Sequence, residues 1–537
     1  MTATQSQSNS TEPIDLGNGL IMRWSTAADI DNLAKLLSES FRWLGIGDPL
    51  PKDAIPPPNE FIKSATSLLM SGKSVAMSEY DYALVEDTQR GKGANPVVAC
   101  VCLHHVKAYY GSVDVTFGKP ELVATDPDYR NQGLVRKLML QMIHPKSDAR
   151  GHVLQVIPGI SHFYRQFGYE YGLCTYTGFD IESSDVLPPL DKTKYSTEPY
   201  TLREATISDL PLLNRLSTPQ ARHANAVVGQ YYTPEFWQYV VHDVHQINKS
   251  RFLGDRDTRI IVETATGREV GFTNTSTVFF GHRLQAMALE EDATYLDVAY
   301  PVLRQLFDIA KERRAKTIKN RPVLPPSHSS TETKEDKEAT TTAETASEKT
   351  AAAPEPRLSM NLNLHEKHPL VVLLGRKAKQ DPEEINPGFR LYTRIGSYPS
   401  FILKVAPELE ARLAASALAG ISGRLRLDFF RSVEGCAAKG LEVFIEKGKI
   451  TQAQGWTNPG PEKLLEERMK WKAAGNEPKV YDAAFPPLVF TMLLTGRQSL
   501  KDLYLAYGDV DIWGHETRLL LNTLFPKGEH FLDLFCW

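Results

Sequence analysis

The sequence predicts a mixed α+β protein built of three successive domains. The chain has 537 residues, whereas a compact domain usually holds roughly 100 to 200 residues, so we expect more than one hydrophobic core. Its content of 42% hydrophobic and 23% charged residues is typical of a globular protein and excludes collagen-like, wholly disordered and disulfide-scaffold classes. Helix-like and strand-like patterns alternate along the chain, which favours a mixture of both elements.

Charge and hydropathy exclude two classes of partner. The 61 Lys and Arg residues nearly balance the 65 Asp and Glu residues, so the net charge of -4 indicates neither nucleic acid nor an anionic membrane as the main partner. The chain has no run of about 18 apolar residues, so we expect no membrane span. Residues 1–15 lack the basic and apolar regions of a signal peptide, and Cys100 and Cys102 fit buried, reduced thiols. A cytoplasmic location is therefore expected.

Two segments are predicted to be disordered. From Pro325 to Arg357 the chain has no Val, Ile, Leu, Met, Phe, Tyr or Trp, and such a segment cannot bury enough apolar surface to offset the entropy of ordering. Strand-like sequence resumes at residues 358–364 and 369–374. We therefore predict a disordered insertion over residues 316–357, and a disordered tail over the polar residues 1–17.

An internal repeat predicts two related domains, residues 18–190 and 198–396. In each copy, Thr followed three residues later by Asp forms the signature of a capping box that starts a helix. A strand hairpin is predicted after each helix, because two runs of strand-like residues are joined there by a turn that contains glycine. The residues that recur at an offset of 180 are Arg23/Arg203, Thr26/Thr206, Asp29/Asp209, Leu33/Leu213 and Leu36/Leu216, and the hairpins are predicted at residues 82–86 with 97–103 and 260–263 with 270–272.

Residues 397–537 predict a third, α+β domain. Residues 406–415 have helical spacing, and alternating apolar and polar residues indicate strands at 423–430 and 441–445. Two amphipathic stretches near residues 500–505 and 519–525 follow. About 140 residues are enough for an independent core.

The strongest functional signal lies in residues 121–143. An apolar strand at residues 122–124 runs through a polar turn into a helix with Leu134, Leu138 and Met142 at a spacing of four. A strand that turns into a helix leaves unpaired N–H groups and the positive end of the helix dipole at one spot, which attracts phosphate. Gly133 allows the backbone to approach a diphosphate closely. The alternative interpretation is an ordinary strand-turn-helix with a basic surface.

These residues resemble the signature of the GNAT superfamily of acyltransferases, Q/R-x-x-G-x-G/A, as Arg130-x-x-Gly133-x-Val135. Val135 departs from the small residue usually found last. The order of helix, hairpin, strand, turn, helix and strand is also that of the family. The resemblance implies acetyl-CoA as cosubstrate, held by the residues Leu122, Val123, Ala124, Arg130, Asn131, Gln132, Gly133, Leu134 and Val135.

A second segment, Phe-Tyr-Arg-Gln-Phe-Gly-Tyr-Glu at residues 163–170, is similar to another hallmark of the family. The resemblance implies that Tyr164 lies near the sulfur of the cosubstrate as a general acid. A phenol with a pKa near 10 stays protonated at neutral pH and can donate its proton to a departing thiolate. The alternative is an aromatic side chain that only packs between strands.

The combination of both motifs, the repeat and the third domain resembles the Eis-like acetyltransferases, which join two GNAT-type domains to a sterol-carrier-protein-like domain. Residues 397–416, 493–500 and 520–535 carry the resemblance in the third domain. In that subfamily the C-terminal carboxylate is the general base, which implies this role for the main-chain carboxylate of Trp537. The alternative is that Trp537 only packs against a neighbouring surface. The resemblance also implies a homo-oligomer.

The second copy is predicted to be non-catalytic. Residues 282–374 contain no glycine, so no counterpart of the Gly133 turn can occur there. We expect one acetyl-CoA per chain. His365 and His368 lack the i, i+4 spacing of a zinc-binding helix, and we expect no metal. The pair His104-His105 is expected at a strand end without a catalytic role.

The predicted function is transfer of an acetyl group from acetyl-CoA to a primary amine by direct attack. The acceptor is a small-molecule amine or a protein lysine, and its pocket is expected near Phe41, Trp43 and residues 49–58. The alternative function is that of a non-catalytic lipid-binding or scaffold protein that uses the sterol-carrier-like domain.

Overall fold

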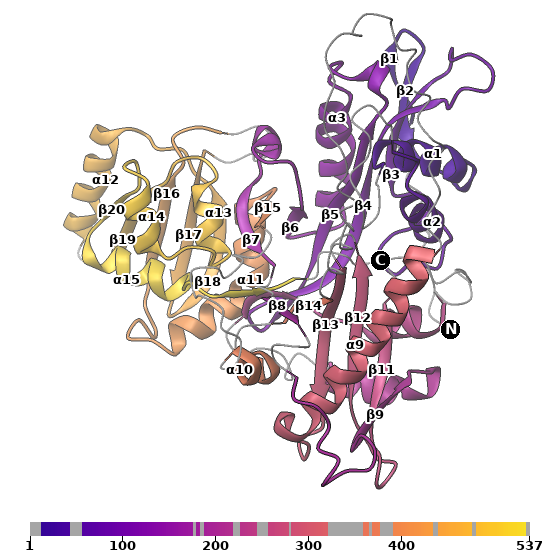
Figure 1. Ribbon diagram of the computed structural model, residues 1–537. Helices are drawn as coiled ribbons and strands as arrows, with labels where there is room; N and C mark the ends of the chain where they lie inside the picture. The colour runs from indigo at the N-terminus through magenta and orange to yellow at the C-terminus, as the bar shows by residue number, and fades with distance from the viewer. Residues whose placement is uncertain are drawn as a thin grey trace, which may run out of the picture.

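The computed structural model describes residues 12–42, 56–175, 179–182, 187–217, 226–243, 256–278, 281–319, 358–364, 368–375, 390–432, 439–474 and 479–532 (Figure 1). These residues form three β-sheets with helices packed on them, which confirms a mixed α/β fold. Among these residues, no helix is both long enough and apolar enough to cross a membrane.

The first sheet carries the sequence motifs. Helices α1 (Ile30–Ser40) and α2 (Glu60–Leu69) cover one face, and α3 (Leu134–Lys137) with its continuations η3 (Leu138–Ile143) and α4 (His144–Ala149) covers the other. Figure 1 shows α1 and α3 on opposite sides of the strands. The strand order is β1 (Ile14–Gly17), β2 (Leu20–Trp24), β3 (Tyr82–Asp87), β4 (Val97–Tyr110), β5 (Val113–Thr125), β6 (Leu154–Ile157), β15 (Arg390–Arg394) and β7 (Glu170–Cys174), and β10 (Ala226–Gln230) pairs with both β4 and β21 (Glu529–Phe531).

The second sheet is covered on one face by the long helix α9 (Tyr295–Lys319) and α10 (Pro369–Gly375). The other face packs against α6 (Leu210–Leu216), α7 (Pro234–Gln238) and η7 (Tyr239–Asp243). The strand order is β8 (Phe179–Glu182), β14 (Ser359–Leu362), β13 (Gly281–Leu289), β12 (Glu269–Val278), β11 (Asp257–Glu263) and β9 (Tyr200–Glu204).

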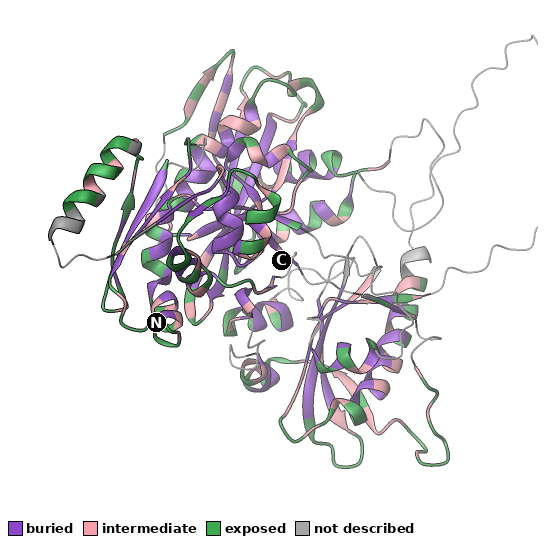
Figure 2. Ribbon diagram, turned by 90° about the vertical axis from the view of Figure 1, so that its left-hand side faces the viewer, coloured by how far each residue is buried: buried purple, intermediate pink, exposed green. Residues whose placement is uncertain are grey.

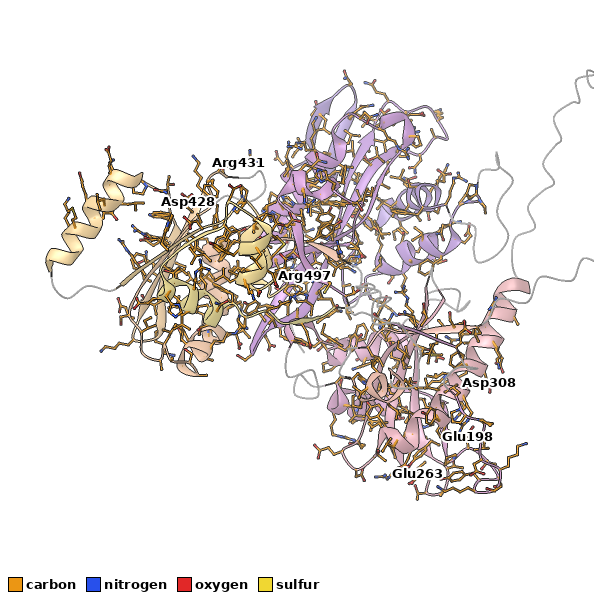
Figure 3. The ribbon with its side chains drawn as sticks, turned by 60° about the vertical axis from the view of Figure 1, so that its left-hand side comes forward. Glu198, Glu263, Asp308, Asp428, Arg431 and Arg497 are labelled. Carbon is orange, nitrogen blue, oxygen red and sulfur yellow. The ribbon has the colours of Figure 1, made fainter. Side chains whose placement is uncertain are left out.

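The third sheet packs against α11 (Tyr398–Ala414), α13 (Val489–Leu494), α14 (Leu500–Ala506) and α15 (His515–Leu524), and α12 (Pro461–Ala474) is largely exposed. Its core is continuous with the first sheet, as the buried ring contact between Tyr110 and Phe401 shows. Arg497 lies where this domain meets the first sheet (Figure 3). Figure 2 shows the buried residues concentrated along the strands. The strand order is β18 (Lys449–Gly455), β17 (Gly440–Glu446), β16 (Gly423–Asp428), β19 (Lys479–Ala484) and β20 (Asp511–Trp513).

The predicted repeat has matching local structure in the first two domains. Thr26 with Asp29 and Thr206 with Asp209 each form a capping box at the start of a short 3-10 turn. Arg23 binds Asp29 at 2.8 Å, and Arg203 binds Asp209 at 2.6 Å. The predicted hairpins are also present, as β3 with β4 and β11 with β12. The two copies therefore have the same local structure at the helix start and in the hairpin.

The domains exchange strands, so the predicted boundaries 18–190 and 198–396 do not follow the sheets. Strand β8 from the first segment pairs with β14 in the second sheet. In return, β15 from the second segment pairs with β6 and β7, and β10 pairs with β4. Alternation of apolar residues predicts that a strand forms, but the choice of its partner depends on which edges are open in the folded sheet.

Four local predictions differ from the structure. Strand β1 pairs with β2, so the disordered tail predicted over residues 1–17 does not extend to Ile14–Gly17. Residues 369–374 form helix α10 and not a strand, because Pro369 fits a first helical turn and His368 accepts the N–H of Leu370 at 3.2 Å. The insertion predicted from residue 316 begins inside α9, and residues 320–357 lie outside the described ranges. His104 and His105 lie within β4 and not at its end.

Candidate active site

A β-bulge interrupts the pairing of β4 with β5 next to the predicted motif. Cys100 lies opposite Ala124 and Cys102 lies opposite Glu121, so two residues of β5 face the single residue between them on β4. One of the two is Leu122, whose φ of 49° is in the left-handed region. Left-handed conformations are strained for leucine, and bulges often redirect the backbone beside active sites.

Strands β5 and β6 separate beside this bulge. Their parallel pairing is confined to Phe117 with Leu154 and Gly118 with Gln155. Both strands continue past these pairs, β5 as far as Thr125 and β6 as far as Ile157. Backbone groups of residues 119–125 on this side are therefore not taken up by β6. Such groups can hydrogen-bond an extended ligand that lies between the two strands.

The turn after β5 is anchored to the hairpin of β3 and β4. The Asp126 side chain accepts the N–H of Asp128 at 3.0 Å and a hydrogen bond from Arg90 at 2.6 Å. The Tyr129 hydroxyl donates to Asp87 at 2.5 Å. The charge-assisted bonds hold the turn in place. The start of the following helix is thereby fixed relative to the sheet.

The helix begins at Leu134 and its N-cap residue is Gly133, which has a φ of 72° and offers no side-chain cap. Asn131, two residues earlier, also has a positive φ, of 63°. Residues 130–133 are exposed, and the Arg130 guanidinium makes no hydrogen bond or ion pair with any residue that the structure describes. The helix continues through η3 and α4. The unpaired N–H groups at its N-terminus and the positive end of its dipole therefore face the exposed residues 130–133. These features fit the diphosphate of CoA.

Replacing Gly133 by alanine is expected to weaken CoA binding about tenfold, because the residue must hold a left-handed φ where a ligand approaches the backbone. Gly151, at the far end of the same helical stretch, is a matched control, since its φ is 70° and an added Cβ would also meet nothing within 4 Å. Titration calorimetry of both variants checks this expectation. Equal CoA affinities for Gly133→Ala and Gly151→Ala would contradict the assigned binding site.

Tyr164 lies in the short 3-10 helix η4 (Phe163–Phe167), between β6 and β7. Its side chain is buried, with 4% exposure, and its ring centroid lies 5.1 Å from that of Phe163 and 6.1 Å from that of Tyr169. Burial raises the pKa of Tyr164 above its ordinary value. Its hydroxyl donates to no residue within the described ranges. Tyr164 is therefore a protonated phenol across the neutral range.

Tyr164 shares one hydrophobic cluster with Leu134 at the helix start and with Val123 at the bulge. This cluster also contains Val135, whereas Leu122 and Ala124 belong to the cluster beneath α1 and α2 on the other face of the sheet. Trp537, Trp43 and residues 49–55 lie outside the described residues. Phe41 lies at the C-terminal end of α1 and is partly exposed.

The corresponding place in the second domain is built differently. Helix α9 follows β13, and Thr294 caps it by accepting the N–H of Leu296 at 3.2 Å. Between residues 281 and 319, which the structure describes without a gap, no residue has a positive φ. The start of α9 therefore lacks a left-handed residue like Gly133, which precedes α3.

Sequence reasoning missed Tyr392, whose ring lies 5.7 Å from that of Tyr164. No local signal marks this residue, because it comes from β15, far along the chain. The structure also shows no group of three or more His, Cys, Asp or Glu side chains suited to a metal ion within the ranges that it describes.

Comparisons with known proteins agree with this geometry. Residues 66–172 match a family described as acetyltransferase (GNAT) domain. The GCN5-related N-acetyltransferase from Kribbella flavida aligns with a TM-score of 0.53 at 14% identity, over 96% of this chain and 100% of that one. The protein of the same description from Anabaena variabilis aligns at 0.52 and 14%, over 96% and 100%. Eis1 from Mycobacterium abscessus aligns at 0.49 and 12%, over 96% and 99%. A search of curated proteins finds no match.

Residues 66–172 therefore form a GNAT-type acetyltransferase domain. The solved structures with TM-scores above 0.5 show that this chain shares their fold over 96% of its length. The three sheets of the structure, with the repeated helix start and hairpin in the first two, agree with the Eis-like resemblance of its motifs.

Proposed function

We propose that the protein is an N-acetyltransferase that transfers the acetyl group of acetyl-CoA to a primary amine. The family supports acyl transfer in general. The observation that carries the proposal is that Tyr164 packs in one cluster with Val123, next to the bulge at Leu122, and with Leu134, which follows the left-handed Gly133. No observation favours the alternative of a non-catalytic lipid-binding protein.

Each group of residues has a separate role in the proposed reaction. The turn at residues 130–135 holds the diphosphate, and backbone N–H groups at residues 122–124 stabilise the negative charge on the carbonyl oxygen. The amine nitrogen forms a bond to the carbonyl carbon, and the bond from that carbon to sulfur breaks. Tyr164 donates the proton of its hydroxyl to the departing sulfur, for which its protonated state is suited. The acylated nitrogen then loses its extra proton to water, and water returns a proton to the Tyr164 phenolate.

A base must remove a proton from the ammonium form of the acceptor, and we assign this role to the carboxylate of Trp537. Strand β21 runs parallel to β10, which runs antiparallel to β4. Phe531 is level with Gly229, which lies opposite Tyr109, so β21 points along β4 toward the bulge. The six residues after Phe531 can span about 20 Å when extended. This length covers most of the interval from Tyr109 to the bulge.

Adding two residues after Trp537 is expected to lower kcat at least 100-fold, because the carboxylate would move away from the acceptor nitrogen. CoA affinity and melting temperature are expected to stay unchanged. The same two residues added before Met1 serve as the control. Full activity of the C-terminal extension would remove this carboxylate from the mechanism and favour a packing role for Trp537.

The acceptor class is tested by thiol release from acetyl-CoA with a panel of small polyamines, aminoglycosides and lysine peptides, followed by mass measurement of the products. We expect a mass increase of one acetyl group on a primary amine. Absence of thiol release with every amine, from a protein that binds CoA, would contradict the proposed function. Light scattering of the same preparation tests the predicted homo-oligomer. The cytoplasmic location of the protein also stays a prediction.

A further inference from the structure

A strand from the second segment of the chain, residues 198–396, completes the surroundings of Tyr164. Strand β15 lies between β6 and β7, and it pairs antiparallel with both. Tyr392 at its centre lies opposite Ile157 of β6 and Tyr171 of β7. More than 200 residues separate Tyr164 from Tyr392 in the sequence. The first domain therefore cannot supply this neighbour of Tyr164 by itself.

Tyr392 is fully buried and makes two kinds of contact around Tyr164. Its ring stacks on Tyr171, with centroids 4.1 Å apart and an interplanar angle of 24°, and lies 5.7 Å from the ring of Tyr164. Its hydroxyl accepts the backbone N–H of His162 at 2.5 Å. The stack fixes the ring of Tyr392, and the hydrogen bond ties that ring to the segment that carries Tyr164.

The hydrogen bond reaches a strained position. His162 has a φ of 67° and directly precedes the 3-10 turn that holds Tyr164. A left-handed residue other than glycine or asparagine persists only where its surroundings hold it there. The N–H of His162 has its partner in Tyr392, so the hydroxyl of Tyr392 stabilises the conformation that sets the start of the turn.

The ring of Tyr164 is also confined by residues close to it in the sequence. A Cβ on Gly159 would lie 2.2 Å from this ring, so glycine is needed for the ring to occupy its place. Phe167 contacts the ring at a centroid distance of 6.2 Å. With Gly159 and Phe167 on its own segment and Tyr392 across the sheet, Tyr164 has little freedom to reorient.

We propose that Tyr392 is a positioning residue for Tyr164, contributed to the active site by the second segment of the chain. The inference rests on the proposed function, since it concerns the direction in which the Tyr164 hydroxyl donates its proton. It assigns the strand exchange a role in catalysis, because insertion of β15 between β6 and β7 is what delivers Tyr392.

The test compares Tyr392→Phe with the unmodified protein and repeats the comparison in a Tyr164→Phe background. Loss of the hydroxyl is expected to lower kcat about tenfold while the CoA dissociation constant changes less than about twofold. In the Tyr164→Phe background the same change is expected to have no effect on kcat, because Tyr392 acts through Tyr164. Equal losses in both backgrounds, or an unchanged kcat in the first, would overturn the proposal.

Tyr110→Phe is the matched control. Tyr110 is also a buried tyrosine of the first sheet, and its hydroxyl donates to the carbonyl of Leu494 at 2.7 Å, at the junction with the third domain. We expect Tyr110→Phe to lower the free energy of unfolding about as much as Tyr392→Phe does, without changing kcat. A loss of kcat equal to that of Tyr392→Phe would show a general effect of buried hydroxyls and overturn the proposal.

A readout independent of turnover separates this proposal from the proposed function. In protein labelled with 13C-tyrosine, the Tyr164 resonance is identified by its loss in Tyr164→Phe. We expect one sharp signal in the unmodified protein and a broadened or doubled signal in Tyr392→Phe, with no change in Tyr110→Phe. An unchanged Tyr164 signal in Tyr392→Phe would refute the positioning role even if the protein acetylated no amine.

Discussion

Tyr164→Phe is expected to lower kcat by a factor of about 10² to 10⁴, which is the usual contribution of a positioned general acid. The substitution removes only the hydroxyl, and this hydroxyl donates to no residue that the structure describes. The ring contacts with Phe163 and Tyr169 are retained. CoA affinity and stability are therefore expected to stay close to those of the unmodified protein.

The expectation has a specific cause. The departing thiolate must gain a proton, and a phenol kept protonated by burial can donate it throughout the neutral range. The measurement is kcat at saturating acetyl-CoA, with CoA binding determined separately. If Tyr164→Phe kept more than about half of kcat, Tyr164 would be a packing residue, which is the alternative that its sequence context left open.

The folded protein is expected to lose stability steeply below about pH 6.5, where an unfolded histidine binds a proton. Burial lowers the pKa of His104 to about 3, of His144 to about 2, of His152 to about 3 and of His530 to about 4. These four side chains are almost fully buried. Between about pH 6.5 and pH 4 the unfolded chain therefore binds protons that the folded chain does not.

The sign follows from proton linkage. Stability rises with pH wherever the unfolded state binds more protons. The four histidines therefore stabilise the fold fully above pH 6.5, and this stabilisation is lost as the pH falls toward their pKa values in the folded state. With four such histidines, the free energy of unfolding changes by up to about 5 kcal/mol per pH unit near pH 5.5. Melting temperatures measured between pH 8 and pH 5 check this expectation. A melting temperature independent of pH over this range would contradict it.

His104→Gln is the control for the proton count. Neither ring nitrogen of His104 has a hydrogen-bond partner among the described residues, so the replacement removes a titrating group without breaking such a bond. We expect proton uptake on unfolding at pH 5 to fall by about one. An uptake equal to that of the unmodified protein would show that His104 is already protonated in the folded state.

The local parts of the site were predictable from the sequence. The strand, turn and helix around Gly133 lie within one short segment, and the spacing of Leu134, Leu138 and Met142 follows from helical geometry. Tyr164 was predictable because its sequence context is itself a family signature. In both cases the proposed chemistry depends on residues close together in the chain.

The long-range parts were not predictable in the same way. Tyr392 has no motif of its own, and its role depends on insertion of β15 between two strands of another domain. Residues 369–374 were predicted as a strand because a short apolar run has no clear period, and the structure shows that they form a helix. The bulge at Leu122 also depends on its partner strand, since only the pairing with β4 shows that one residue is extra.

Titration calorimetry with CoA tests the central claim most directly, which is that the turn at Gly133 is a diphosphate site and that the start of α9 is not. The account predicts saturable binding of one CoA per chain by the folded protein. Binding of two CoA molecules per chain, or no detectable binding, would contradict it.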